Sequence, residues 1–326
     1  MIRRRLMLWG LTAATFLPRT SFAQSHEVYR VGLLTAGPAL TDKTPAVIDL
    51  TKAFAKRGYT VGGNLAFERR AALGKIDTLP RLVEELNTAG VKTIMTIGYP
   101  TALAAKERSA VPVVVLSSGD PVATHLVASL AHPGGNVTGV SEIATELSAK
   151  RLQLLKETVP SLQKIAMLWN ADDLGMTLRY EAADAVARQL GVIVQSLGVR
   201  APDDFNTAFV AMDRDRPDGL LMVTDALTNL NHKRVFAYAA AHKLPAIYEY
   251  DFLVRDGGLM SYGPDRSEVA DLAAGLVDRI LKGDKPADLP LEEPTRFLLV
   301  INQKTADAIG LTIPQSILAR ADEVID

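Results

Sequence analysis

The sequence predicts an α/β fold of two lobes, each built from a parallel β-sheet flanked by helices. Apolar runs without alternation, such as Val113–Leu116, indicate strands that are buried on both faces, as in parallel sheets. Short loops join such runs to segments with helical spacing, and this series restarts near Lys164. The length of 326 residues also suits two domains better than one.

The first series alternates strands and helices from Tyr29 to Val140. Its predicted strands are apolar or alternating runs, at Tyr29–Leu34, Leu65–Arg69, Val91–Ile97, Val113–Leu116 and Val137–Val140. Its predicted helices have apolar residues at helical spacing and end near Gly or Pro, at Pro45–Arg57, Ile76–Ala89, Ala102–Arg108 and Pro121–Leu130. Strands joined by such helices form βαβ units, and these build a parallel sheet.

The second series repeats this order without close sequence similarity, so it predicts a second lobe of similar architecture. Its predicted strands are Lys164–Trp169, Val192–Val199, Gly219–Val223 and Leu244–Tyr248. Its predicted helices are Leu147–Thr158, Thr177–Leu190, Pro202–Met212 and Leu230–His242. The remaining chain predicts two strands, at Gly257–Ser261 and Phe297–Ile301. It also predicts two helices, at Ser267–Leu281 and Gln303–Ile309, and a short apolar helix in the tail.

The stretch from Val113 to Leu130 carries the first indication of a ligand site. A buried strand ends at Leu116, a small polar loop follows, and Asp120 stands directly before Pro121. Asp is a preferred helix N-cap, and Pro is tolerated at the first helical position. In open α/β sheets, ligands bind at the carboxyl edge, and a helix N-terminus there favours an anion. An ordinary strand–loop–helix connection without a ligand is the alternative.

The first 23 residues predict a secretory signal peptide. Arg3, Arg4 and Arg5 form a basic segment, an apolar run follows from Leu6 to Leu17, and small residues end the segment at Ala23. The apolar run is too short for a membrane span, which needs about 20 residues. Removing this segment lowers the net charge from −1 to −5, because it carries four arginines and no acid.

Composition narrows the class of protein further. A negative mature chain does not favour nucleic acid as a partner. The chain has no cysteine, so it has neither disulfides nor a residue for a lipid anchor after the signal peptide. These features predict a soluble, exported protein of a bacterial periplasm.

Signals of catalysis and of cofactor binding are missing from the sequence. No dinucleotide fingerprint follows the first strand, and no phosphate-binding loop, zinc-protease motif or nucleophile elbow occurs. The five histidines are scattered, and the acids Asp172 and Asp173 alone do not make a metal site. We therefore expect no catalytic residues, no metal site and no cofactor.

Several motifs resemble the ABC transporter substrate-binding proteins, specifically those described as tryptophan/tyrosine transport substrate-binding proteins. The motifs cover essentially the whole mature chain in the expected order. They are RVGLLTAG (30–37), GDPV with LVASLAHPGGNVTGVS (119–141), KRLQLLKETVP (150–160), IAMLWN (165–170), LPAIY (244–248), GGLMSYGP (257–264), ILKGDKPADLP (280–290) and INQKTADAIGLTIPQSILARADEVI (301–325).

The resemblance implies a type I periplasmic-binding-protein fold, in which three crossings join two Rossmann-like lobes around a ligand cleft. It places residues 28–141 and 262–292 in lobe 1, and residues 142–261 and 293–326 in lobe 2. It implies a monomer that captures a small polar solute, such as an amino acid or an aromatic acid, and delivers it to an ABC permease in the inner membrane. The alternatives are an exported sensor subunit for a membrane receptor and an exported α/β enzyme.

In lobe 1, three loops should meet at the cleft, and they carry most of the candidate ligand-binding residues. Thr101 and Ser118 have hydroxyls beside predicted helix N-termini, suited to a carboxylate. Tyr99 can form an aromatic wall, and the glycines let backbone N–H groups approach a ligand. The full set in lobe 1 is Thr35, Gly37, Gly98, Tyr99, Pro100, Thr101, Ser118, Gly119 and Asp120.

The second lobe contributes residues at strand ends and at the crossings. Asp225 or Glu249 can neutralise a ligand ammonium, and a solvated loop acid is the alternative for each. Tyr262 either stacks on a ligand or packs in the hinge. The predicted residues here are Ser141, Asn170, Asp172, Asp225, Tyr248, Ser261 and Tyr262.

Overall fold

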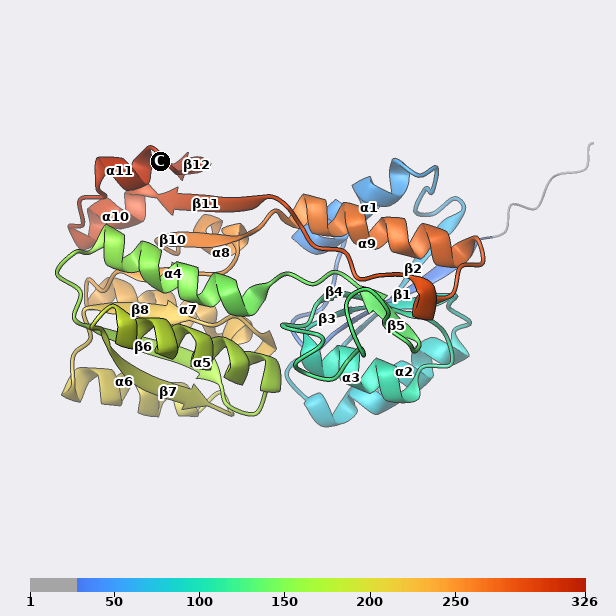
Figure 1. The fold of residues 1–326 in the computed structure, drawn as a ribbon, viewed down its shortest axis with the longest axis horizontal. Coiled ribbons are helices and arrows are strands. Elements are labelled where there is room, and N and C mark those ends of the chain that lie inside the picture. The colour runs from blue at the N-terminus through green and yellow to red at the C-terminus, as the bar shows by residue number, and fades with distance from the viewer. Residues whose placement is uncertain (1–27) are drawn as a thin grey trace, which may run out of the picture.

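The computed structural model describes residues 28–326, which form two α/β lobes side by side (Figure 1). The predicted signal peptide at residues 1–23 lies outside the described residues. Three connections run between the lobes, and the C-terminus ends in the lobe that holds the second series of strands. No helix among residues 28–326 has the length and apolar character needed to cross a membrane.

Lobe 1 is built on a fully parallel sheet of five strands in the order β2-β1-β3-β4-β5. Its strands are β1 (Tyr29–Thr35), β2 (Leu65–Ala71), β3 (Thr93–Ile97), β4 (Val113–Ser117) and β5 (Val137–Gly139). Val113, Val114 and Val115 are completely buried. This confirms that the unbroken apolar run marks a strand covered on both faces.

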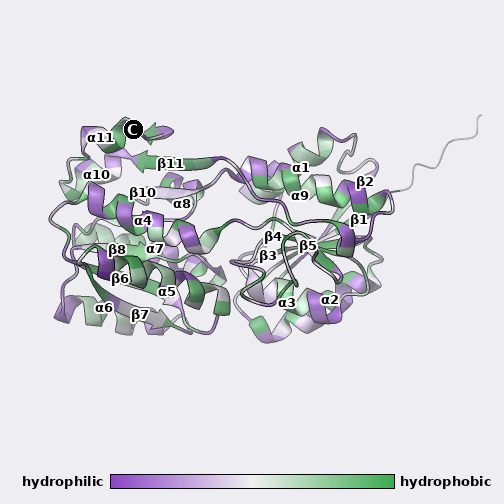
Figure 2. Ribbon diagram, in the orientation of Figure 1, coloured by the Kyte–Doolittle hydropathy of each residue, from purple (hydrophilic) through white to green (hydrophobic). Residues whose placement is uncertain are grey.

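Helices cover both faces of this sheet. On one face, α1 (Pro45–Ala55) and α9 (Arg266–Leu281) pack onto β1, β3 and β4 around Phe54. On the other face, α2 (Leu79–Thr88) and α3 (Tyr99–Arg108) enclose a second cluster around Leu86. Each helix carries both hydrophobic and hydrophilic residues (Figure 2), and this mixed composition lets it bury one side against the sheet and expose the other.

Lobe 2 has a mixed sheet of seven strands in the order β12-β11-β10-β9-β8-β6-β7. Only the β10–β11 pair is antiparallel among the strand pairs of the described residues. The strands are β6 (Lys164–Asn170), β7 (Ile193–Val199), β8 (Gly219–Met222), β9 (Ala246–Tyr248), β10 (Met260–Pro264), β11 (Phe297–Asn302) and β12 (Glu323–Ile325).

The helices of lobe 2 also form two layers. One layer packs around Met167 and Ile301, and it contains α4 (Ala144–Thr158), α5 (Leu174–Gln189), α10 (Gln303–Ile309) and α11 (Gln315–Leu318). The other packs around Phe205 and Tyr248, and it contains α6 (Asp204–Arg214), α7 (Ala226–Ala241) and α8 (Asp251–Arg255). The predicted two-lobe α/β class is therefore confirmed.

The crossings lie close to one another along one side of the molecule (Figure 1). The first follows β5, where the Ser141 N–H donates to the Glu292 carbonyl at 2.8 Å. The second joins β10 to α9, so the expected boundary after Ser261 falls inside a strand and the crossing comes after Pro264. The third leads from Glu292 to β11.

The expected helix at Pro121–Leu130 does not form, and this prediction is wrong. Asp120 caps a single turn, because its Oδ1 accepts from the N–H groups of Val122 and Ala123 at 3.0 Å each. His125 then has a φ of 58°, a left-handed conformation that a helix does not continue through. Leu126 is drawn into the core of lobe 1, and the segment continues as turns.

Four other helices begin three or four residues earlier than the apolar spacing predicted. α3 starts at Tyr99 rather than Ala102, α4 at Ala144 rather than Leu147, α5 at Leu174 rather than Thr177, and α7 at Ala226 rather than Leu230. Their first turns mix polar, small or Pro residues with few apolar ones, so hydrophobic periodicity does not reveal them. As a result, residues expected in loops lie at helix N-termini that face the space between the lobes.

Candidate functional site

A cavity of about 1270 Å³ lies between the two lobes. Its lobe 1 wall comes mainly from the segments that follow β1, β2, β3 and β4, and its lobe 2 wall from those that follow β6, β7, β8 and β9. These are the carboxyl ends of parallel strands, where ligands bind in open α/β sheets. Segments that follow eight strands therefore meet at one place.

Nine of the expected ligand-binding residues line this cavity. They come from both lobes: Thr35, Gly37, Gly98, Tyr99, Pro100, Ser118, Asn170, Asp172 and Asp225. The Thr35 hydroxyl accepts the Gly37 N–H at 3.0 Å and so fixes the first loop. Asp172 lies at the exposed edge, where it pairs with Arg200 at 3.0 Å.

The other expected residues of lobe 1 and its first crossing lie behind the cavity wall. The Thr101 hydroxyl donates to the carbonyls of Ile97 and Gly98, at 2.9 and 2.7 Å, so it serves its own helix. The Asp120 carboxylate accepts hydrogen bonds from the turn that it caps. Gly119 and Ser141 likewise do not contribute to the cavity lining.

Three expected residues of lobe 2 belong to its sheet. Tyr248 is buried, with its ring edge-on to Phe236 at a centroid distance of 5.0 Å. Ser261 and Tyr262 lie in β10, paired with β11, and the Tyr262 ring packs against the core of lobe 2. Strand pairing carries all three away from the cavity.

Three buried polar atoms on the cavity wall have no hydrogen-bond partner among residues 28–326. They are the Ser118 hydroxyl of lobe 1 and, in lobe 2, the Arg179 Nε and the Thr224 hydroxyl. The exposed fractions of these residues are 2%, 1% and 8%. A buried polar group without a partner costs about 1 to 3 kcal/mol, so a ligand that offers acceptor atoms would recover this free energy.

A buried ion cluster fixes the Arg179 side chain. Its Nη1 lies 2.8 Å from the Glu249 carboxylate, whose other oxygen lies 2.9 Å from Arg151. All three side chains are about 1% exposed. Burial opposes the charge on Arg179, but the Glu249 carboxylate outweighs it and raises the pKa of Arg179. Arg151 in turn donates to the Tyr262 carbonyl at 2.7 Å, which ties α4 to β10.

A second buried acid, Glu142, links the lobes at the floor of the cavity. The Tyr250 hydroxyl lies 3.0 Å from a Glu142 carboxylate oxygen and 3.3 Å from the Ser117 hydroxyl. Tyr250 belongs to lobe 2, Ser117 ends β4 of lobe 1, and Glu142 stands on the first crossing. Burial raises the pKa of Glu142, although its hydrogen bonds act in the opposite direction.

Two carboxylates cap helices on the lobe 2 wall. Asp225 caps α7 through a capping box with Thr228, and its other oxygen accepts from Asn170 at 2.5 Å. Asp173 caps α5, is 2% exposed, and accepts from the Met176 N–H at 3.3 Å. Burial and then the nearby charge of Asp225 raise the pKa of Asp173 to about 6. This wall can therefore neutralise a cationic group of a ligand.

The two lobes touch each other at glycines. A Cβ atom at Gly119 would lie 3.3 Å from the Gly175 Cα, and one at Gly74 would lie 3.2 Å from the Leu230 Cδ1. Gly37 faces Ala226 in the same way at 3.9 Å. Because these contacts bring backbones together across the cavity, the structure is a closed form of the two lobes.

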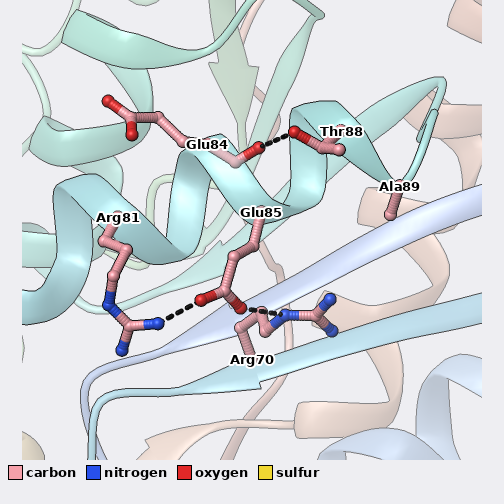
Figure 3. A pocket seen from close by; sticks show the side chains of 6 residues that line it. All are labelled: Arg70, Arg81, Glu84, Glu85, Thr88 and Ala89. Atoms are coloured by element: carbon pink, nitrogen blue, oxygen red, sulfur yellow. Dashed lines mark hydrogen bonds and ion pairs between the residues drawn. The ribbon is translucent and has the colours of Figure 1, made fainter.

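A second pocket lies outside the cleft, on the surface of α2 and β2 (Figure 3). Glu85 occupies its centre between Arg81 and Arg70, and the Arg70 Nε lies 2.8 Å from the Glu85 carboxylate. Arg70, Arg81 and Glu85 pair with one another, and Glu84 is exposed to water, so this pocket does not indicate a ligand as the cavity does. Among residues 28–326, no group of acids and histidines has the arrangement of a metal site.

Sequence reasoning missed Arg179, Thr224, Glu142 and Tyr250 among the cavity residues. Arg179 lies inside a helical segment, where arginine ordinarily faces solvent. Glu142 follows Ser141 at the crossing, and Thr224 precedes Asp225 at a strand end. Their positions next to expected site residues could therefore have indicated that they line the cavity. Glu249, considered as a partner for a ligand ammonium, lies behind the wall and holds two arginines instead.

Comparison with known proteins places the chain in a family. The family model described as ABC transporter substrate binding protein matches residues 32–325. A tyrosine-binding protein of Clostridioides difficile (strain R20291) is 26% identical over 261 residues, which is 80% of this chain and 75% of that protein.

Solved structures agree in fold. A conserved domain protein of Vibrio cholerae O1 biovar El Tor has a TM-score of 0.83 and 24% identity, covering 91% of this chain and all of that chain. A Streptococcus pneumonia ABC domain in complex with L-Trp has a TM-score of 0.82 and 24% identity, over 92% of this chain and all of that one. The fold is that of type I periplasmic binding proteins, and the chain belongs to the ABC transporter substrate binding protein family.

Proposed function

We propose that this protein is the solute-binding component of an ABC importer. It captures a small polar solute, an amino acid or an aromatic acid, between its lobes outside the cytoplasm and delivers it to the permease in the inner membrane. No chemistry is performed on the solute. The open form admits the solute, and contacts available only in the closed form then favour closure.

The observation that carries this proposal is the set of unpartnered polar atoms in the cavity. The Ser118 hydroxyl comes from one lobe, and the Arg179 Nε and the Thr224 hydroxyl come from the other. A carboxylate held among them would accept hydrogen bonds from both lobes, and an opened cleft would break part of that set. The family relatives named above, a tyrosine-binding protein and an L-Trp complex, support a solute of this class.

Thermal unfolding of refolded, ligand-stripped protein against amino acids, aromatic acids, nucleosides and sugars tests the proposal. A solute that binds only the folded state adds about 2.7 kcal/mol of stability at a hundred times its dissociation constant. We expect a raised midpoint with amino acids or aromatic acids. A panel without any shift would contradict solute capture of this class.

Two matched substitutions separate binding from folding. Thr224→Val removes a cavity hydroxyl, whereas Thr96→Val removes a buried, unpartnered hydroxyl that lies outside the cavity lining. We expect Thr224→Val to weaken solute binding about tenfold, the loss of a hydrogen bond to a charged group, and Thr96→Val to leave it unchanged. Equal affinities for both variants would argue against a solute held at Thr224.

Delivery to a permease needs a test in cells. Deletion of the gene should abolish uptake of the radiolabelled solute at micromolar concentration, and the Thr224→Val variant should restore it only in part. If uptake persists while a membrane receptor loses its response to the solute, the protein is an exported sensor subunit instead.

A further inference from the structure

The mouth of the cleft carries exposed apolar side chains from both lobes. Leu73 is 59% exposed, Ile76 is 42% exposed and Leu230 is 40% exposed, and all three line the cavity. We call these three residues the rim patch. Leu73 and Ile76 belong to the segment after β2 in lobe 1, and Leu230 belongs to α7 in lobe 2.

The rim patch is continuous across the cleft. Gly74 follows Leu73 directly, and a Cβ atom there would lie 3.2 Å from the Leu230 Cδ1. The apolar surfaces of the two lobes therefore meet at the mouth. Exposed apolar surface that is gathered beside a cavity, rather than scattered singly, marks a place where an apolar group binds.

Leu73 is held in a conformation that leucine avoids. Its φ is 53°, in the left-handed region, where a residue with a Cβ atom is strained. The backbone keeps it there, because the Leu73 N–H donates to Gly37 at 3.2 Å and the Gly74 N–H donates to Ala36 at 2.8 Å. A glycine would fit this conformation without strain. A strained residue that presents a large apolar side chain to a cleft points to a role in binding.

The cavity also differs in chemistry from floor to mouth. Its buried floor holds the unpartnered atoms of Ser118, Arg179 and Thr224, whereas its mouth holds the rim patch. Its volume of about 1270 Å³ exceeds the range of roughly 300 to 1000 Å³ that is usual for small-molecule sites. A ligand that fills it has a polar head at one end and an apolar arm at the other.

From these observations we infer that the rim patch is a binding subsite for an apolar arm of the solute, longer than the side chain of an aromatic amino acid. The ligand class is an amphipathic organic acid, with its carboxylate on the cavity floor and its arm between Leu73, Ile76 and Leu230. This inference rests on the proposed solute-binding function, and it extends the class of solute beyond simple amino acids.

A fluorescent amphipathic acid, 11-(dansylamino)undecanoic acid, is the probe, and L-tryptophan is the compact reference. We expect the probe to bind one-to-one with enhanced fluorescence, and Leu230→Ala and Ile76→Ala each to weaken it about tenfold, because each loses several buried methylene-sized groups. Leu190→Ala is the matched control, because Leu190 is a 37% exposed leucine of lobe 2 outside the cavity lining. This control should leave probe binding unchanged.

The Leu73→Gly variant distinguishes a direct loss of probe binding from a loss caused by misfolding. This change removes the strained Cβ, so we expect unchanged or higher thermal stability together with weaker probe binding. We expect L-tryptophan, with its carboxylate on the cavity floor, not to contact the rim patch, so any binding of L-tryptophan should be equal in wild type and in the rim variants.

Three results would overturn the inference. Probe binding that is equal in wild type and rim variants would show that the rim patch does not hold the apolar arm. Binding of L-tryptophan without binding of the probe would leave the solute-binding function intact and limit the solute to the size of an amino acid. If neither compound binds, this arm subsite is wrong, and the solute panel decides the proposed function separately.

Discussion

A Cβ atom at position 175 would lie 3.6 Å from the Cβ of Tyr99, across the cleft between the lobes. This separation is within the range found between cysteines in disulfides, about 3.5 to 4.5 Å. The chain has no cysteine of its own, so an introduced pair can react only with itself within one molecule. We predict that Tyr99→Cys/Gly175→Cys forms a disulfide under mild oxidation, which free-thiol titration and mobility on a non-reducing gel would show.

The disulfide should lock the lobes in the closed form and block solute exchange until it is reduced. Tyr99→Cys/Leu190→Cys is the control, because Leu190 lies at the opposite end of α5 and this pair should stay reduced. If the first pair also stays reduced at long times, the lobes do not approach each other as the structure shows.

A larger side chain at position 175 should affect the thermal stability of the fold and the closure of the lobes differently. The residue lies in the first turn of α5, so Gly175→Ala favours the helix by up to about 1 kcal/mol. The added Cβ would, however, lie 3.2 Å from the Asp173 Oδ1 that caps the same helix and 3.3 Å from the Ser118 carbonyl oxygen of the facing lobe. The crowded cap offsets the gain in helix stability, so we predict a nearly unchanged thermal midpoint with weaker solute binding, and a stronger loss of binding in Gly175→Val.

Gly135→Ala is the control for this pair of effects, because a Cβ there would have no neighbour within 4 Å. Calorimetry gives the thermal midpoint, and isothermal titration with the solute found by the panel gives the affinity. Unchanged affinity in Gly175→Val would show that the lobes do not need this contact to close.

The buried cluster around Glu249 should dominate the stability of lobe 2. Glu249→Gln leaves Arg151 and Arg179 buried without their shared counter-charge, and breaking such a cluster costs about 3 to 5 kcal/mol. Urea denaturation should show a matching fall in the free energy of unfolding. Glu68→Gln, which removes the partly exposed partner of the exposed Arg30, should cost less than about 1 kcal/mol. Similar losses for both variants would contradict the cluster's role.

Asp173 should make the protein less stable as the pH rises from about 4 to about 6. The ordinary pKa of an aspartate, 3.8, applies to the unfolded chain, whereas burial raises the pKa in the folded protein to about 6. Between these values the folded state binds the proton more tightly, so stability is highest at the acid end and falls with rising pH. The full effect is about 3 kcal/mol.

Asp173→Asn keeps an equally good helix cap and removes the ionisation. We predict that it raises the unfolding midpoint at pH 7.5 and leaves it nearly unchanged at pH 4. The difference between the unfolding curves of wild type and variant isolates this residue from other acids. A variant that is less stable than wild type at pH 7.5 would show that the carboxylate is stabilised in the folded state.

Most of the order of strands and helices could be predicted, because most elements leave a local signal, whereas the short α8 and β12 were not expected. The run Val113–Leu116 has the apolar character of a buried strand, and Pro133 and Gly134 mark the turn before β5. The helix expected after Asp120 does not form, because burial of Leu126 in the core of lobe 1 outweighs a good cap and an apolar spacing. Local propensity is a weak predictor where tertiary packing competes with it.

The cavity floor could be predicted only in part, for a different reason. Ser118 and Asp225 stand at strand ends, so topology alone brings them to the cleft. Arg179 is buried only because Glu249, 70 residues away in the sequence, lies 2.8 Å from it in the fold. No local pattern records such a pairing, and a lone arginine in a helix is ordinarily interpreted as surface charge.

The path of the chain between the lobes has a consequence for how the protein is made. The sheet of lobe 1 is complete at Gly139, but α1 covers only part of the face that packs around Phe54, and the rest is covered by α9, at Arg266–Leu281. The sheet of lobe 2 is completed later still, because β11 and β12 follow α9 in the chain. Each lobe therefore needs residues that are made after the other lobe has begun, and no single cut divides the gene into two independently folding halves.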